Sequence, residues 1–373
     1  MPGLIERRKE YLELIRRFTL EQGYFTVGDI AEEAGVPRST AQDWITRLMD
    51  EGCVVQKEGK RGRAPARFQA VSVLPRSACR RIFTTIDGDR VEIYHECLST
   101  GSAAFCEFHH RQAGGILSRV SRDGTLLREC ATLGEADARI GLHPSPAVGV
   151  VGLRKEGDTI VQRIRCIGGP AYSLTDMMGM AAGVERVDLR KDGMLVEGEV
   201  TTRALRYVAI GIDDTDSREG GATFAVSLAL LQQVSSLPGV IPIGHHVAML
   251  YPDLKEKTGG NSCSFIEVAV APESCQVVQD RSLRFISDES LSPEWGLAVK
   301  TGFTVPMELR EYGNRVRRQE VTRKAAVTVA EHCGIRIEGG RGVIGAVAAL
   351  SFIGLETPVL LDPTREIRGD AGR

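Results

Sequence analysis

Residues 207–212, Tyr-Val-Ala-Ile-Gly-Ile, form a wholly apolar run that ends directly in a cluster of acids. An apolar run of this length predicts a buried strand, so the sequence places carboxylates at the C-terminal end of that strand. Asp213, Asp214 and Asp216 lie within four positions of one another. Carboxylates so close together repel strongly unless a cation or backbone N–H groups offset their charge.

This acidic loop is predicted to bind a metal ion. Successive residues of an extended segment point to opposite faces, so Asp214 and Asp216 are expected to converge while Asp213 faces away. Two carboxylate oxygens suit Mg²⁺ bound together with a nucleotide, whose phosphates supply further ligands. The candidate metal ligands are therefore Asp213, Asp214 and Asp216. A solvated acidic turn is the alternative interpretation.

Glycine-bearing segments around the loop predict a phosphate site. Glycines allow the backbone to approach phosphate closely, and the helix expected from Ala222 presents free N–H groups. A second such segment, residues 251–261, carries lysines and a glycine pair before the next expected strand. The candidate nucleotide-binding residues are Ser217, Gly220, Gly221, Thr223, Lys257, Gly259, Gly260 and Asn261. Asp214 and Thr223 are the candidate catalytic residues. A third cluster, residues 339–346, is equally compatible with close helix–sheet packing.

Four motifs occur in a fixed order and resemble one enzyme core. They are Ile212-Asp-Asp-Thr-Asp-Ser217 with Gly220–Thr223, Lys257-Thr-Gly-Gly-Asn261, Gln319-Glu-Val-Thr-Arg323 and Gly340-Arg-Gly-Val-Ile-Gly-Ala-Val-Ala-Ala349. Together they resemble the kinase-like core of the archaeal agmatinylcytidine synthetase that modifies an isoleucine tRNA. The resemblance covers about residues 205–355. In length and core composition the chain looks closer still to the methanogenesis marker protein 11 family of methanogenic archaea.

The resemblance implies ATP and Mg²⁺ as cofactors of the acidic loop. In the synthetase, ATP activates the base and also phosphorylates a threonine in this loop, and Thr223 lies at the matching position. Two departures limit the comparison. Ala222-Thr223-Phe224 stands where the synthetase has Cys-Thr-Thr, and the sequence after residue 355 shows no OB domain or zinc ribbon. Agmatine and RNA as substrates therefore stay an alternative.

The first seventy residues predict a winged helix-turn-helix. Tyr11, Leu14, Ile15 and Phe18 give one apolar helix face, and Thr26 with Asp29 predicts the start of a second helix. A third helix is expected over 39–51, closed by Gly52 and followed by a basic wing. DNA contacts are expected from Arg38, Ser39, Thr40, Gln42, Lys60, Arg61, Arg63 and Arg67. Docking of a protein partner is the alternative, and a regulator whose core senses nucleotide is the second functional hypothesis.

Residues 75–203 predict a mainly-β or α+β domain without an assigned role. Hairpin strands are expected at 90–97 and 104–110, further strands at 147–153, 159–167, 184–189 and 194–201, and a helix at 172–182. On the expected hairpin, His95, Cys97, Cys106, His109 and His110 would lie close together. Metal binding by this group is left open, because its spacing matches no common zinc motif.

The remaining expectations concern the whole chain. Its 373 residues predict several domains of an α+β multidomain protein. These are residues 1–70, residues 75–203, an ATP-binding, kinase-like or ferredoxin-like core at 204–363, and a frayed tail at 364–373. The core is expected to contain strand 207–212, helix 222–235, strands 243–250 and 263–271, and helices 313–333 and 343–352.

Location and partners follow from composition. Nine cysteines without a C-x-x-C pair fit a reducing cytoplasm. The charged amino terminus and the lack of a long apolar run predict neither a secretory signal nor a membrane span. A net charge of −2 means that any nucleic-acid contact must come from a local patch. A homodimer is left open.

Overall fold

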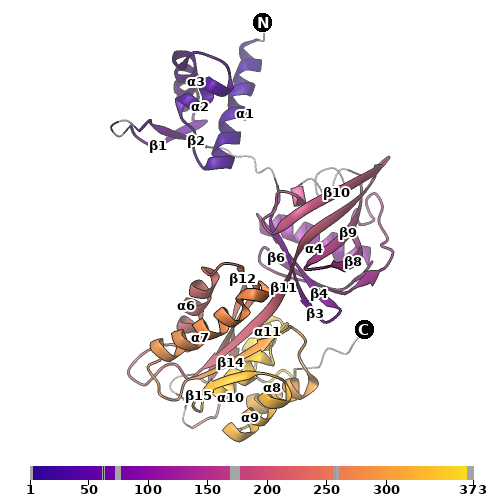
Figure 1. The fold of residues 1–373 in the computed structure, drawn as a ribbon, viewed down its shortest axis with the longest axis vertical. Coiled ribbons are helices and arrows are strands. Elements are labelled where there is room, and N and C mark those ends of the chain that lie inside the picture. Colours follow the sequence, from indigo (N-terminus) through magenta and orange to yellow (C-terminus); the bar gives the residue numbers. More distant parts are fainter. Residues whose placement is uncertain are drawn as a thin grey trace. The chain divides into compact units, whose positions relative to one another are not determined.

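The computed structural model describes residues 3–60, 62, 64–71, 77–168, 177–255, 257 and 260–367. They form two compact units, Met1–Ser77 and Ala78–Arg373, which we call the N-terminal and C-terminal units (Figure 1). No described helix is long and apolar enough to cross a membrane.

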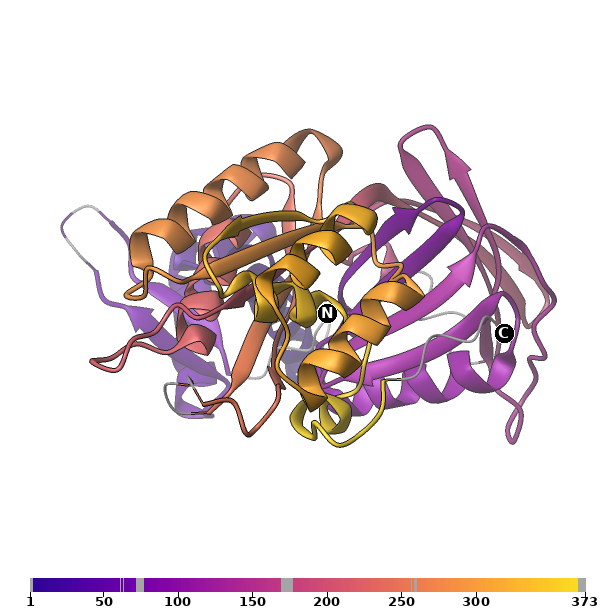
Figure 2. The same cartoon turned by 90° about the horizontal axis from the view of Figure 1, so that it is seen from below.

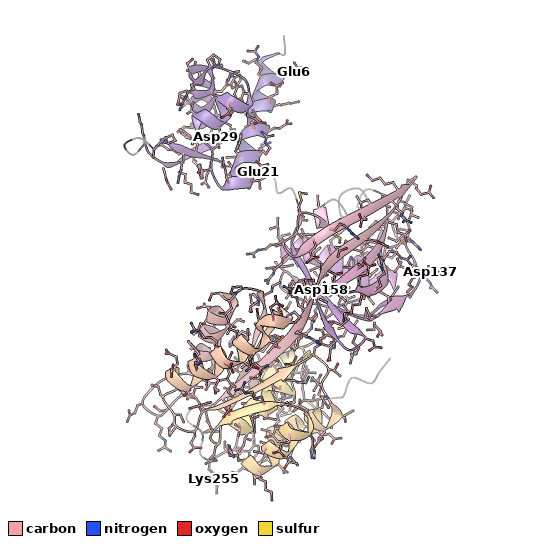
Figure 3. All side chains as sticks on the ribbon, in the orientation of Figure 1. Glu6, Glu21, Asp29, Asp137, Asp158 and Lys255 are labelled. Atoms are coloured by element: carbon pink, nitrogen blue, oxygen red, sulfur yellow. The ribbon has the colours of Figure 1, made fainter. Side chains whose placement is uncertain are left out.

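The N-terminal unit is built from three helices and a two-stranded ribbon. In chain order these are α1 (Leu4–Gln22), α2 (Val27–Glu33), α3 (Arg38–Asp50), β1 (Val54–Glu58) and β2 (Arg67–Ala70). Thr26 and Asp29, the latter labelled in Figure 3, cap α2 reciprocally: the Asp29 N–H donates to Thr26 Oγ1, and the Thr26 N–H donates to the Asp29 carboxylate. Tyr11 and Ile15 pack with Leu48 in a single apolar core. The predicted helix-turn-helix with its ribbon is therefore confirmed.

The C-terminal unit begins with a β-rich half, residues 78–203. Its elements are β3 (Cys79–Asp87), β4 (Arg90–Cys97), α4 (Thr100–Ala113), β5 (Leu117–Asp123), β6 (Leu126–Thr132), β7 (Gly134–Glu135), β8 (Val148–Glu156), β9 (Thr159–Ile167) and β10 (Val184–Asp192). With β11 (Leu195–Asp213), the strands follow the order β5-β6-β4-β3-β11-β9-β8-β7, and β10 pairs with β11. The strands expected at 147–153, 159–167 and 184–189 are confirmed, with Gly193 turning at φ 58°.

Strand β11 (Leu195–Asp213) leaves the β-rich half and continues into the second half, residues 204–367, which we call the pocket half. Its first part pairs with β9 and β10, and its last part pairs with β13 (Ser262–Val270) and β14 (Gly296–Thr301). The separate strands expected at 194–201 and 207–212 are thus one strand of 19 residues. The domain boundary expected at 203–204 falls inside it.

The pocket half is a sheet covered on both faces (Figures 1 and 2). Strand order is β12-β13-β11-β14-β15, all antiparallel. The remaining elements are α6 (Thr223–Ser235), β12 (Val240–Met249), α7 (Cys275–Glu289), α8 (Met307–Arg318), α9 (Arg323–His332), β15 (Arg336–Gly339), α10 (Val343–Leu350) and α11 (Thr357–Leu361). Val208 and Ile210 pack under α6 and α7, whereas Tyr207 and Ala209 pack under α8, α9 and α10. Burial on both faces explains why the run at 207–212 is continuously apolar.

Two of the expected secondary-structure elements are wrong. The strand expected at 104–110 is part of helix α4, because Ser99 caps a helix there by accepting a hydrogen bond from the Ser102 N–H. The single helix expected at 313–333 is the pair α8 and α9, separated by an extended Gln319 and restarted by the Thr322 cap. The helix expected at 172–182 lies largely outside the described residues.

Two arginines of α8 are buried in the pocket half. Arg310 and Arg317 are buried, and their guanidinium groups donate to backbone carbonyls of residues 351–365. They therefore bind the following chain to α8.

A buried ion network connects the two halves of the C-terminal unit. Arg128 on β6 lies 2.8 Å from Glu92 on β4 and 2.9 Å from Glu267 on β13. Tyr207 donates to Glu267, and His246 Nε2 lies 2.6 Å from the same carboxylate. Although burial acts to raise it, the pKa of Glu267 is held well below its usual value by the charges of Arg128 and His246.

Replacement of Arg128 by alanine tests this connection. The change leaves Glu92 buried without its cation and Glu267 with His246 alone, and we expect it to lower the free energy of unfolding of the C-terminal unit by about 3–5 kcal/mol. Arg154→Ala is the control, because Arg154 pairs with Glu199 at the surface, where such pairs contribute about 1 kcal/mol or less. Urea denaturation measures both. Equal losses in the two variants would contradict the assignment.

Candidate functional site

The four sequence motifs meet at one pocket of about 340 Å³ at the end of β11. Its lining comes from the acidic loop, the loop before β13, the segment after α8 and the start of α10. The predicted site residues among the lining are Asp213, Asp214, Asp216, Ser217, Lys257, Gly260 and Asn261. Segments more than a hundred residues apart thus supply one set of polar groups.

All three carboxylates line this pocket, so the expectation that Asp213 faces away is wrong. Strict alternation fails because the chain turns sharply at Asp214, which has φ 54°. Among the described residues it is the one non-glycine with positive φ, a conformation that costs free energy in L-residues and clusters at functional sites. The turn brings adjacent carboxylates to the same side.

The electrostatic state of the acidic loop favours a bound cation. Burial, and next the charge of Asp214, raise the pKa of Asp213 well above its usual value. Burial and the charge of Asp216 also raise the pKa of Asp214, while Arg341 opposes that rise. Within the described residues the anionic loop is thus incompletely neutralised, which a divalent cation would correct.

The two loop glycines and Thr223 lie beside the pocket and are not among its lining residues. Ser217 and Gly220 exchange backbone hydrogen bonds of 2.9 and 3.3 Å, so the Gly220 N–H has a partner within the loop. Gly221 turns at φ 91° against Asp216. The buried Thr223 hydroxyl lies 3.1 Å from Asp216 Oδ1 and accepts from the Thr215 N–H. These residues shape the loop in this structure.

A lysine and an amide from the loop before β13 also line the pocket. Asn261 Nδ2 donates to the Tyr251 carbonyl over 2.8 Å, and the exposed Lys257 donates to the Pro252 carbonyl. Gly259 lies outside the described residues. Lys255, labelled in Figure 3, lies in the same loop.

Sequence reasoning omitted Arg341 from the site residues. Its side chain lines the pocket near Asp214, and its N–H donates to Glu294, another lining residue. The glycine motif around Arg341 was a usable signal. The same motif also packs closely: a Cβ at Gly345 would fall 1.8 Å from Asp213 Oδ2. The segment 339–346 therefore both lines the pocket and packs closely against the sheet.

The candidate DNA-binding surface is on the N-terminal unit. On α3, Arg38, Ser39 and Gln42 are exposed, and Thr40 is half-buried. Lys60 is exposed, whereas Arg67 pairs with Glu58 at 3.2 Å and stacks on Tyr24. Arg61 and Arg63 lie outside the described residues. The exposed face of α3 is thus the main described part of this surface.

Comparison with known proteins gives relatives for both units. Residues 12–73 match the family described as "Sugar-specific transcriptional regulator TrmB". The chain is 25% identical over 268 residues to the uncharacterized protein MJ0921 of Methanocaldococcus jannaschii, covering 70% of this chain and 89% of that protein.

Part of the chain is homologous to tRNA-modifying enzymes. It is 29% identical over 148 residues to TiaS, the isoleucine-tRNA 2-agmatinylcytidine synthetase of Pyrobaculum neutrophilum, and 32% identical over 148 residues to that of Methanopyrus kandleri. Each match covers 38% of this chain and about a third of the synthetase, 34% and 33%. The crystal structure of TiaS in complex with its isoleucine tRNA and ATP aligns with a TM-score of 0.36 at 23% identity, covering 39% of this chain and 36% of that one.

The raised pKa of Asp213 gives a prediction about stability. A carboxyl whose pKa is higher in the folded than in the unfolded state weakens folding as pH rises above the unfolded value, about 4. Without divalent cations, Asp213→Asn should therefore stabilise the C-terminal unit at pH 7, on the order of 1 kcal/mol, and the gain should vanish below about pH 4.

Thermal denaturation of both proteins across this pH range, with a chelator present, measures the effect. Asp123→Asn, which changes an exposed carboxylate, is the control and should show no pH-dependent gain. A destabilised Asp213→Asn at pH 7 would contradict the electrostatic account.

Proposed function

We propose that the pocket half binds ATP with Mg²⁺ and transfers a phosphoryl or nucleotidyl group to an RNA acceptor. The observation that carries the proposal is the meeting of Asp213, Asp214 and Asp216 with Lys257 and Arg341 at one pocket. Hard carboxylate oxygens suit Mg²⁺, and the two cationic side chains suit a polyphosphate. Homology to tRNA-modifying synthetases supports RNA as the acceptor class.

The residues divide into binding and positioning roles. Asp213, Asp214 and Asp216 would hold Mg²⁺, which supplies charge neutralisation for the phosphates. The charge of Arg341 opposes the rise of the Asp214 pKa, and Arg341 lines the same pocket as the carboxylates. Asn261 fixes the loop that carries Lys257 through its bond to Tyr251.

Thr223 is proposed as a catalytic hydroxyl. Its Oγ1 lies 3.1 Å from Asp216 Oδ1, which makes that carboxylate the natural acceptor of its proton. The side chain is 8% exposed, so reaction at this oxygen requires the loop to open.

A relation to the methanogenesis marker protein 11 family, an archaeal source and a cytoplasmic location belong to the same proposal. The match to MJ0921 over most of its length supports a shared architecture.

ATP turnover by the full-length protein tests this function. With Mg²⁺ and bulk tRNA, with or without agmatine, we expect turnover that Asp214→Asn reduces by about 100-fold, because one of the carboxylates that would hold the Mg²⁺ is lost. Asp123→Asn should retain full activity. ATP labelled on the α- or γ-phosphate shows which group reaches RNA. Absence of turnover, or turnover unaffected by Asp214→Asn, would overturn the proposal.

A second candidate function is DNA binding by the N-terminal unit. The match to the TrmB family and the exposed residues of α3 favour it specifically. Under this hypothesis, the protein is a regulator whose pocket half senses nucleotide.

Fluorescence anisotropy with duplex DNA tests the second candidate. Arg38→Ala together with Gln42→Ala should weaken binding about tenfold or more, because a phosphate contact and a base contact are lost. Lys9→Ala removes an exposed charge from α1 and should have little effect. Equal weakening by both changes would indicate non-specific attraction, and binding unaffected by either would exclude α3 as the contact.

A further inference from the structure

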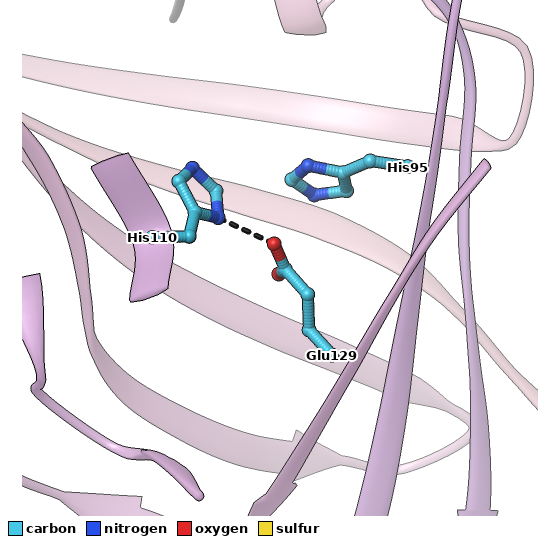
Figure 4. A group of neighbouring side chains, drawn as sticks. All are labelled: His95, His110 and Glu129. Atoms are coloured by element: carbon cyan, nitrogen blue, oxygen red, sulfur yellow. Dashed lines mark hydrogen bonds and ion pairs between the residues drawn. The ribbon is translucent and has the colours of Figure 1, made fainter. Parts of the chain in front are cut away.

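Three ionisable side chains lie in the apolar core of the β-rich half, away from the acidic pocket. His95 comes from β4, His110 from α4 and Glu129 from β6 (Figure 4). Their exposures are 2%, 2% and 0%. The neighbouring inward positions on β4, Val91 and Ile93, are apolar, so charged groups here need a specific compensation.

The three side chains converge on one point. One nitrogen from each histidine and one carboxylate oxygen lie within 4.8 Å of one another. His110 Nδ1 is 2.5 Å from Glu129 Oε1, and the two imidazole rings meet edge to face with centroids 5.4 Å apart. Figure 4 shows the rings and the carboxylate turned toward the same space.

An ion pair between His110 and Glu129 leaves buried polar atoms unsatisfied. His95 Nε2 and Glu129 Oε2 have no hydrogen-bond partner of ordinary geometry among the described residues. The side-chain amide of Gln162 also has no such partner among the described residues. Gln162 approaches His95 from β9 and is 1% exposed. Buried polar atoms without partners are rare, and a group of them around one point indicates a missing ligand.

The types of donor atom identify the ligand class. Two imidazole nitrogens and one carboxylate oxygen are the protein donors of three-ligand zinc sites and of related iron sites. Mg²⁺ and Ca²⁺ prefer oxygen donors, which this group does not supply in sufficient number.

We propose that His95, His110 and Glu129 bind a divalent first-row transition-metal ion, of which Zn²⁺ is the best fit. The ion links α4 to strands β4 and β6 and satisfies the atoms that the ion pair leaves open. Gln162, which approaches His95, would orient a water molecule bound to the ion. The site is separate from the Mg²⁺ site of the proposed function and does not depend on it.

The donor set differs from the one left open by the sequence. Cys97 and Cys106 lie beside each other, where their mutual hydrogen bond lowers the pKa of Cys97, and they are outside the three-residue group. His109 Nδ1 accepts from the Ala147 N–H over 2.9 Å and is occupied. Glu129 was not among the candidates, because it reaches the histidines only through strand pairing between β4 and β6.

Elemental analysis of the purified full-length protein tests the proposal. We expect about one equivalent of zinc or another first-row metal in the wild type and in Asp214→Asn. Loss of the metal is expected in His95→Leu and in Glu129→Gln. His109→Gln and Cys106→Ser are matched controls and should retain it. Protein stripped by a chelator should show a lower Tm, which Zn²⁺ restores, and should develop visible absorption with Co²⁺.

His95→Leu shows whether His95 binds a metal ion or only lies beside the ion pair of His110 and Glu129. If only the ion pair exists, leucine removes an unsatisfied nitrogen and the Tm stays level or rises. If a metal is bound, the Tm falls to that of the stripped wild type and no longer responds to Zn²⁺. A wild type without transition metal that also fails to bind Co²⁺, or metal that survives both ligand substitutions, overturns the proposal.

Discussion

The C-terminal unit depends on the continuity of strand β11. Its 19 residues pair with β9 and β10 at one end and with β13 and β14 at the other, so the backbone hydrogen bonds of both halves share one element. Because both faces of its last part are covered by helices, the chain must leave the sheet abruptly when polar residues begin. The acidic loop is placed at that exit. Helix α10 comes so close that a Cβ at Gly211 would lie 2.1 Å from the Ala346 carbonyl oxygen.

Buried carboxylates have different neighbours at two places in this unit. In the Arg128 network each carboxylate has a cationic partner, and the pKa of Glu267 is lowered. In the acidic loop the carboxylates face one another, and the pKa values of Asp213 and Asp214 are raised. Paired groups stabilise a fold, whereas groups kept in mutual repulsion lower stability and persist where a ligand offsets them. This contrast favours function at the loop over a structural role.

Sequence patterns predicted those parts of the fold that depend on residues close together in the chain. The Thr26–Asp29 cap and the apolar run at 207–212 were visible because each needs only neighbouring residues. Helix α4 was mistaken for a strand, since Phe105 and Phe108 are of a residue type that favours strands, although both lie exposed on the helix. The inward turn of Asp213 was missed because it follows from a positive φ at Asp214. Arg341 and Glu129 become site candidates only through strand and helix packing between distant segments.

The surroundings of Thr223 support both a reactive role and a structural one. A hydroxyl hydrogen-bonded to a carboxylate is suited to lose its proton, and that supports a reactive role. The same contact, with the bond from the Thr215 N–H, anchors the loop and keeps Oγ1 buried. Both roles are compatible because a carboxylate has two oxygens: Asp216 can bind a cation through one oxygen while Oδ1 keeps its bond to Thr223 and takes the hydroxyl proton.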